Sequence, residues 1–213
     1  MRRNNTLSSS LHPNDYETPI TEAYRTIRTA IKFAAEDQSR KVLLFCSSIP
    51  GEGKTSIIAN LGRLFAQDHK AVLLLDGDLR RPHLHSLFAL NNRTGLSSIL
   101  LGYSNPEESV QSTQIPNLSV LTAGPIQPNA AELLGSPRLE ETLSLLKDAY
   151  DIILVDAPSL LTVSDAQLLA QVADGIVLVI RSQVTHKEQL IKAQQFLEPF
   201  RPKVLGAILN DRS

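Results

Sequence analysis

The stretch from Cys46 to Leu61, CSSIPGEGKTSIIANL, decides how the rest of the chain is interpreted. Its centre, Ser48 to Thr55, follows the pattern G-x-x-x-x-G-K-[ST], except that a serine replaces the first glycine. An apolar run typical of a buried strand precedes the pattern, and a helical pattern follows it. A glycine-rich turn between a strand and a helix would have a similar composition. The complete pattern in this context favours a loop that binds the phosphates of a nucleotide.

The residue types in this loop suit phosphate binding. Glycines allow successive backbone N–H groups to converge on phosphate oxygens, and the N-terminus of the following helix favours negative charge. Lys54 is expected to neutralise the β- and γ-phosphates, and the Thr55 hydroxyl is expected to ligate Mg²⁺. The predicted nucleotide-binding residues are Pro50, Gly51, Glu52, Gly53, Lys54, Thr55 and Ser56.

Six short apolar runs alternate with helical patterns along the chain. The runs are almost continuously hydrophobic, which is typical of strands buried on both faces of a parallel sheet. The sequence therefore predicts one α/β domain with a doubly wound, mostly parallel sheet flanked by helices. The expected strands are 42–48, 71–76, 118–123, 151–158, 175–180 and 204–210. The expected helices are about 22–36 with Thr21 as its cap, 54–67, 83–90, 137–148, 164–172 and 186–198.

The start of the chain differs from the rest. Residues 1–19 are polar and contain two prolines, so we expect a flexible arm before a domain over 20–213.

Composition excludes several classes of protein. A net charge of -1, from 21 basic and 22 acidic residues, gives no reason to expect nucleic-acid binding. The chain has one cysteine, Cys46, which we expect to be buried in a strand. No apolar run approaches the roughly 20 residues of a membrane helix, and no secretory signal is recognisable.

Three aspartates follow buried strands. Asp76 and Asp78 stand in AVLLLDGDLRRP, and Asp156 stands in DIILVDAPS. Asp-Gly alone is an ordinary turn signal. These aspartates, however, come at the carboxyl ends of expected parallel strands, and ligands in open α/β sheets bind at that edge of the sheet. One aspartate of the first pair can hold Mg²⁺ and the other can accept a proton from an incoming hydroxyl. The predicted metal ligands are Thr55, Asp78 and Asp156, and the predicted catalytic residues are Asp76, Asp78 and Lys54.

Two basic residues follow the aspartate pair. Arg80 and Arg81 could stabilise phosphate charge or bind a neighbouring molecule, or they could begin a solvated helix. His83 and His85 come next, and they lack cysteine or carboxylate partners at the spacing of a metal site. We expect both histidines to lie on the surface.

Together these motifs resemble the bacterial tyrosine kinases of capsule and exopolysaccharide assembly. The resemblance spans about residues 17–211 and rests on SSIPGEGKTS, VLLLDGDLRRP and IILVDAP, with support from ITEAYRTIRTAI, TAGPIQPNAAELL and LGAILND. It implies a P-loop fold related to MinD and ParA, ATP and Mg²⁺ as cofactors, and phosphoryl transfer to protein tyrosines. In the family, one of the paired aspartates activates the tyrosine hydroxyl. We favour Asp76 as this base, with Asp78 as the alternative.

The resemblance also implies partners. Glu22, Arg25 and Arg28 match the family's E-x-x-R-x-x-R motif, which forms the interface of a ring of subunits. An exposed helix with internal salt bridges would show the same spacing. Asn210 matches the position of the family's adenine contact. Gram-positive members are cytosolic chains that a transmembrane adaptor of the chain-length-regulator type activates, so we expect a cytoplasmic protein at the membrane periphery.

Two other functions stay open. A ring-forming ATPase that regulates polysaccharide assembly could bind nucleotide with little kinase activity. The family usually carries a tyrosine-rich tail, whereas the tyrosines here are Tyr16, Tyr24, Tyr103 and Tyr150, of which Tyr16 is the most accessible candidate for modification. A positioning ATPase of the ParA type is disfavoured, because Ile49 stands where that branch carries its signature lysine.

Overall fold

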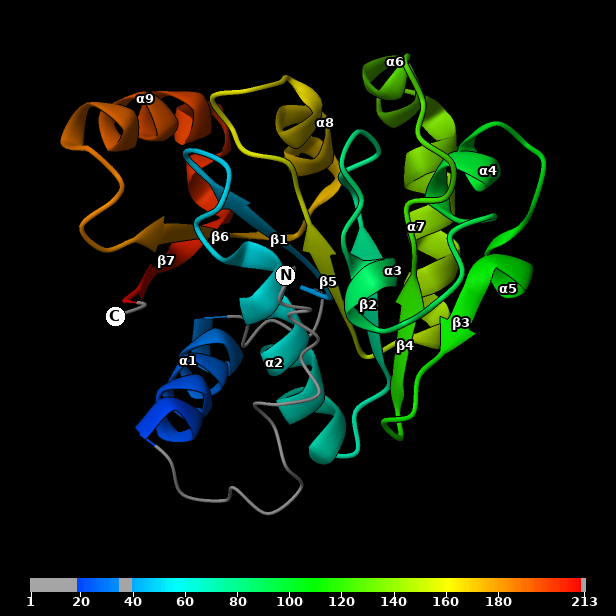
Figure 1. The fold of residues 1–213 in the computed structure, drawn as a ribbon, viewed down its shortest axis with the longest axis horizontal. Helices are drawn as coiled ribbons and strands as arrows, with labels where there is room; N and C mark the ends of the chain where they lie inside the picture. The colour runs from blue at the N-terminus through cyan, green and yellow to red at the C-terminus, as the bar shows by residue number, and fades with distance from the viewer. Residues whose placement is uncertain (1–18, 35–39, 212–213) are drawn as a thin grey trace, which may run out of the picture.

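The computed structural model describes residues 19–34 and 40–211, and a seven-stranded sheet forms its centre (Figure 1). The strand order is β3-β4-β2-β5-β1-β6-β7. All neighbouring strands pair in parallel except β3, which runs antiparallel to β4. The strands are β1 (Val42–Ser47), β2 (Val72–Asp76), β3 (Val110–Ser112), β4 (Leu118–Leu121), β5 (Ile152–Asp156), β6 (Gly175–Arg181) and β7 (Val204–Asn210). This confirms the predicted doubly wound, mostly parallel sheet.

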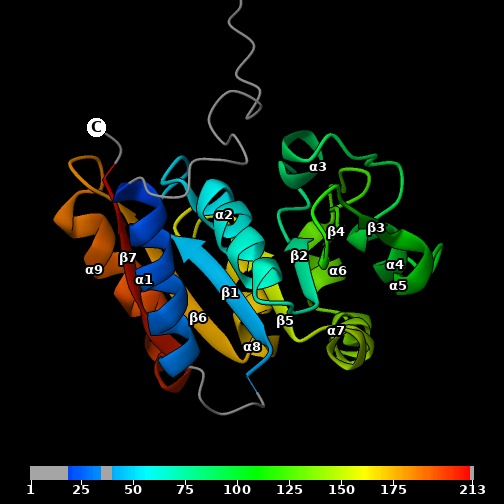
Figure 2. The same cartoon turned by 90° about the horizontal axis from the view of Figure 1, so that it is seen from below.

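Helices cover both faces of the sheet. α1 (Pro19–Ala34) and α2 (Lys54–Gln67) lie side by side on one face (Figure 2). α7 (Pro137–Ala149), α8 (Asp165–Val172) and α9 (Lys187–Leu197) belong to the other layer. The shorter helices are α3 (Leu84–Leu87), α4 (Leu96–Leu100), α5 (Pro106–Ser109) and α6 (Ala130–Leu134), and a 3₁₀ helix, η2 (Glu198–Lys203), precedes β7.

The central strands are apolar on both faces because each face of the sheet packs against a hydrophobic core. Leu43 and Phe45 of β1 pack in the core under α1 and α2, whereas Leu44 and Cys46 pack in the core on the opposite face. All four side chains are fully buried. Burial raises the pKa of the Cys46 thiol to about 12, so this cysteine is an unreactive core residue, as predicted.

Most differences from the sequence prediction concern short elements and helix ends. The prediction that Thr21 caps the first helix was wrong, because α1 begins at Pro19, and proline fits the first helical position well. The predicted arm over residues 1–19 is one residue too long, because Pro19 belongs to α1, and residues 1–18 lie outside the described residues, as does the predicted end of this helix near residue 36. β3, α4, α5 and α6 were missed because runs of three to five residues show no clear periodicity. Within residues 19–34 and 40–211, no helix combines the length and apolarity needed to span a membrane.

Candidate functional site

The sheet topology brings the three predicted motifs to one edge. The phosphate loop joins the end of β1 to the start of α2, and β5 lies between β1 and β2. Asp156, the last residue of β5, is in register with Phe45 of β1 and with Asp76 of β2. The loop, the aspartate pair and Asp156 therefore meet at the carboxyl edge of the sheet, where ligands of open α/β sheets bind.

Two glycines give the loop its shape. Gly51 and Gly53 have φ angles of +83° and +94°, a region in which other residues are strained. A Cβ atom on Gly53 would also lie 2.2 Å from Nδ2 of Asn210. The glycine at position 53 is therefore required both for its backbone angle and for the close approach of β7.

The loop's functional side chains contact the strand ends. Lys54 Nζ donates to Ser47 Oγ at 2.8 Å, and the Thr55 hydroxyl donates to Asp156 Oδ2 at 2.5 Å. Two buried oxygens here, Asp156 Oδ1 and Ser48 Oγ, have no hydrogen-bond partner among the described residues. Buried polar atoms are almost always paired, so an unpaired carboxylate oxygen beside a hydroxyl fits a site built for a ligand.

This donor set suits Mg²⁺. Magnesium binds one or two protein oxygens together with water and substrate phosphates, rather than a full cage of side chains. In the described part of the chain, no group of three or more His, Cys, Asp or Glu residues is placed to hold a metal. Thr55 and Asp156 therefore fit a nucleotide-bound magnesium better than an ion held by protein groups alone.

Asp76 is completely buried and organises the turn that follows β2. Its Oδ1 accepts from the N–H of Asp78 at 3.3 Å, and its Oδ2 accepts from those of His83 and Leu84 at 2.9 and 3.0 Å. Burial, aided by the charge of Asp156, raises the pKa of Asp76 to about 7. Burial also raises the pKa of Asp156 to about 6, although the charge of Lys54 opposes this shift. Both carboxyls can therefore exchange protons close to neutral pH.

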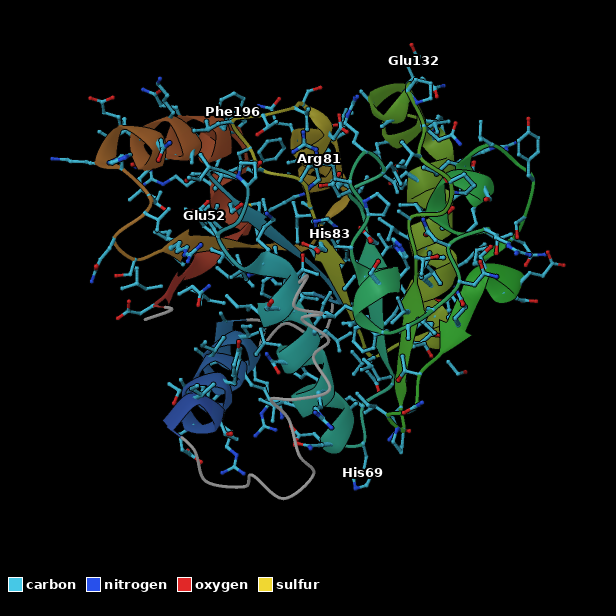
Figure 3. All side chains as sticks on the ribbon, in the orientation of Figure 1. Glu52, His69, Arg81, His83, Glu132 and Phe196 are labelled. Atoms are coloured by element: carbon cyan, nitrogen blue, oxygen red, sulfur yellow. The ribbon has the colours of Figure 1, made fainter. Side chains whose placement is uncertain are left out.

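Asp78 and the two arginines have different environments. Asp78 is half-buried, and its Oδ1 accepts from the N–H groups of Arg80 and Arg81 at 3.2 and 2.9 Å. The Arg80 guanidinium binds both carboxylate oxygens of Asp165, at 2.8 and 3.2 Å, and Asp165 is fully buried at the start of α8. Arg80 therefore fastens the turn to α8, whereas Arg81 and His83 are exposed beside it (Figure 3).

The side chains of Glu52 and Asn210 make contacts within the protein that the sequence pattern does not predict. The Glu52 carboxylate is buried and accepts from Arg181, the last residue of β6, and from Thr185, which follows β6. The Asn210 side chain donates to the carbonyl of Glu52 at 2.9 Å. An adenine contact of Asn210 stays a prediction, and the structure adds a role for this residue in holding the loop.

The three residues of the E-x-x-R-x-x-R motif also differ from one another. Arg25 pairs with Glu22 on the exposed side of α1. Arg28 instead contacts α2, where it donates to Asp68 Oδ1 at 2.8 Å and to the Leu64 carbonyl at 3.2 Å. A ring interface formed by these residues stays a prediction, and Arg28 has an additional role in attaching α1 to its own domain.

Sequence reasoning missed four residues that shape the site. Ser47, Asp165, Arg181 and Thr185 contact Lys54, Arg80 or Glu52 through side-chain or backbone groups. Ser47 could have been found from its place at the end of the strand before the loop. The other three contacts join segments far apart in the chain, and the sequence contains no local signal for them.

Comparison with known proteins agrees with this geometry. A family model described as an AAA domain matches residues 40–201. Tyrosine-protein kinase YwqD of Bacillus subtilis (strain 168) is 49% identical over 192 residues, which cover 90% of this chain and 81% of that protein. The putative tyrosine-protein kinase CapB of Staphylococcus aureus is 36% identical over 211 residues, covering 99% of this chain and 92% of that protein.

Solved structures extend the comparison to the fold. The chimerical protein CapA2B2 superposes with a TM-score of 0.88 at 37% identity, covering 94% of this chain and 88% of that one. The septum site-determining protein MinD of Pyrococcus horikoshii OT3, solved with Mg-ADP, gives a TM-score of 0.69 at 26% identity, covering 80% and 70%. The MinD-like fold is thus confirmed, and the identity to YwqD and CapB shows that the chain belongs to the family of bacterial tyrosine-protein kinases.

Proposed function

We propose that this chain transfers the γ-phosphoryl group of ATP to protein tyrosines and thereby regulates capsule or exopolysaccharide synthesis. Membership of the bacterial tyrosine-protein kinases makes it an ATP-dependent enzyme of that class. The observation that best supports the proposed site is the contact between Thr55 and Asp156, whose second buried oxygen is unpaired. Asp156 ends β5, which lies between β1, the strand that leads into the phosphate loop, and β2, the strand that ends in Asp76.

The chain's own residues would share the chemistry as follows. The loop N–H groups and Lys54 would hold the phosphates, while Thr55, Asp78 and Asp156 would hold Mg²⁺. Magnesium, when bound, neutralises charge on the β- and γ-phosphates. The tyrosine oxygen forms a bond to the γ-phosphorus as the bond to the bridging oxygen breaks, and ADP leaves with that electron pair. Catalysis then rests on positioning and charge neutralisation.

The proton of the tyrosine hydroxyl needs an acceptor. A general base works best when its pKa lies near the working pH, and the pKa of Asp76 is raised to about 7. We favour Asp76 as the base because its pKa suits proton transfer near neutral pH, and Asp78 is the alternative because its carboxylate is the more exposed of the two. The dependence of kcat on pH would be measured in Asp76→Asn and Asp78→Asn. The variant that lacks the general base should lose the rise of kcat with pH.

The test of the site uses Lys54→Met. Purified chain, Mg·ATP, a tyrosine-bearing acceptor protein and a cytoplasmic adaptor peptide would be mixed, and mass spectrometry would locate phosphate. We expect phosphotyrosine with the natural chain and none with the variant, because the lysine that neutralises the phosphates is gone. Circular dichroism would show that the variant is folded. Undiminished phosphotyrosine in Lys54→Met would overturn the assignment, and nucleotide binding without phosphotyrosine would favour a regulatory ATPase.

The partners belong to the same proposal. A transmembrane adaptor would recruit the chain to the membrane and activate it, and α1 would join subunits into a ring. Support comes from the family resemblance and from the exposed Glu22–Arg25 pair on α1. If the adaptor peptide leaves both nucleotide affinity and phosphotyrosine yield unchanged, activation by an adaptor is wrong.

A further inference from the structure

Glu52 is an unusual residue for a loop that binds anions. It lies between the two glycines of the loop, yet its side chain is completely buried, on the β6 side of the loop (Figure 3). A carboxylate removed from water needs hydrogen-bond donors, because burying it unpaired is costly. The question is therefore which groups satisfy it, and what their contacts do to the loop.

Three donors from two segments satisfy the carboxylate. Oε2 accepts from the N–H of Ile49 at 2.8 Å, at the start of the loop itself. Oε1 accepts from the N–H of Arg181 at 3.2 Å and from the hydroxyl of Thr185. Glu52 thus joins the phosphate loop to the segment 181–185, which lies 129 to 133 positions further along the chain.

Two further contacts hold the same part of the loop. The Arg181 guanidinium donates to the carbonyl of Gly51 at 3.3 Å, and the Asn210 side chain donates to the carbonyl of Glu52 at 2.9 Å. The segment 181–185 is itself fixed at its far end, where His186 and Gln189 form a capping box on α9. The loop is therefore held against a well-anchored neighbour.

The charge of Glu52 does not help to bind a polyphosphate, since like charges repel. What the carboxylate offers is two acceptor oxygens facing donors on both sides. A glutamine can accept through one oxygen only, and its NH₂ group would face an N–H group of Ile49 or Arg181. The glutamate is thus suited to hold the backbone of the phosphate loop in a fixed position against the segment 181–185.

We propose that Glu52 is a positioning residue that sets the phosphate loop through the segment 181–185, so that nucleotide affinity depends on the Glu52–Thr185 contact. This inference rests on the proposed function of the loop as the ATP site. Glu52 acts through the loop backbone and not by touching the reacting atoms.

The test compares Glu52→Gln with a matched pair at its partner, Thr185→Val and Thr185→Ser. Affinity for Mg·ADP would be measured by calorimetry at a temperature where circular dichroism shows every variant folded. We expect Glu52→Gln and Thr185→Val to weaken binding about tenfold each, and Thr185→Ser, which keeps the hydroxyl, to stay within about twofold. The double variant Glu52→Gln/Thr185→Val should be weaker than Glu52→Gln by much less than a further factor of about ten, because the two changes share the Glu52–Thr185 contact.

Controls separate positioning from simple destabilisation. Glu140→Gln, an exposed change on α7, should keep the natural affinity. The KM for ATP should rise in Thr185→Val while kcat changes little, since binding and not chemistry is impaired. If Glu52→Gln does not fold, the Mg·ADP affinities of Thr185→Val and Thr185→Ser test the inference without it.

Two results would overturn the inference in distinguishable ways. Lower thermal stability with unchanged Mg·ADP affinity in Glu52→Gln and Thr185→Val would show that Glu52 only stabilises the fold. Failure of the natural chain to bind Mg·ADP would overturn the proposed function, and this inference with it.

Discussion

The carboxyl of Asp76 experiences two opposing effects. Three backbone N–H groups favour its ionised form, whereas complete burial and the neighbouring Asp156 favour the protonated form. Burial dominates, so the pKa lies well above that of an exposed aspartate. The native state consequently holds a proton at pH values where the unfolded chain has already lost it.

This difference predicts how stability depends on pH in the magnesium-free protein. Because the folded state binds more protons between about pH 4 and pH 7, Asp76 and Asp156 should make the free energy of unfolding fall as pH rises through this window. The fall from about pH 5 to about pH 7.5 should be on the order of 2 kcal/mol for Asp76. Urea denaturation in EDTA would measure it. Asp76→Asn should flatten the dependence, whatever its effect on absolute stability, and an equally steep dependence in that variant would contradict the prediction.

The Thr55 hydroxyl is a proposed ligand of Mg²⁺. Thr55→Ala removes the group that contacts Asp156, whereas Thr55→Ser keeps it. We expect the alanine variant to need roughly tenfold more Mg²⁺ for half-maximal phosphotyrosine formation, because one of the proposed oxygen ligands of the metal is lost. A magnesium titration of the kinase assay would show this. Equal magnesium requirements for the alanine and serine variants would mean that the hydroxyl is not a ligand.

Among the helices and strands, the long, uniformly apolar strands were predictable and the contacts between distant segments were not. β1, β2 and β5 were expected within two residues of their observed ends, because burial on both faces leaves a continuous hydrophobic run. That pattern also placed Asp76 and Asp156 at one edge. The pairing of Arg80 with Asp165, 85 positions away, depends on where α8 packs, which no local pattern encodes. The burial of Glu52 was missed for the same reason.

The two arginines of α1 have different surroundings. Arg28 contacts Asp68 and the Leu64 carbonyl on α2, whereas Arg25 pairs with Glu22 on the exposed side of the helix. Arg28→Ala should lower the free energy of unfolding by about 1 kcal/mol, the typical value for such partly exposed contacts. Arg25→Ala should change stability by less than about 0.5 kcal/mol, because exposed pairs contribute little.

Urea denaturation and sedimentation velocity would be measured on the same samples. If α1 forms the ring interface, Arg25→Ala should lose the assembly while staying as stable as the natural chain. A change in assembly with Arg28→Ala alone would show that α1 must be attached to α2 before it can meet a neighbour. Unchanged assembly in both variants would contradict the proposed interface.

For the whole molecule, the candidate site draws its groups from segments that are far apart in the chain. The loop after β1, the ends of β2 and β5, and Asn210 at the end of β7 all contribute. The two cores lie on opposite faces of the sheet, and the site lies at the strand ends between them. A nucleotide bound there would contact segments belonging to both layers, so its binding free energy should stabilise the fold as one unit.

Mg·ADP should therefore raise the thermal midpoint of the natural chain. A ligand that binds only the native state, at about 100 times its Kd, adds about 2.7 kcal/mol. For a domain of this size that corresponds to a shift of roughly 5–10 °C. Scanning calorimetry with and without Mg·ADP would measure the shift, and Lys54→Met should show little of it. An equal shift in Lys54→Met would place the nucleotide away from the phosphate loop, since a ligand on the loop must lose affinity when the lysine is removed.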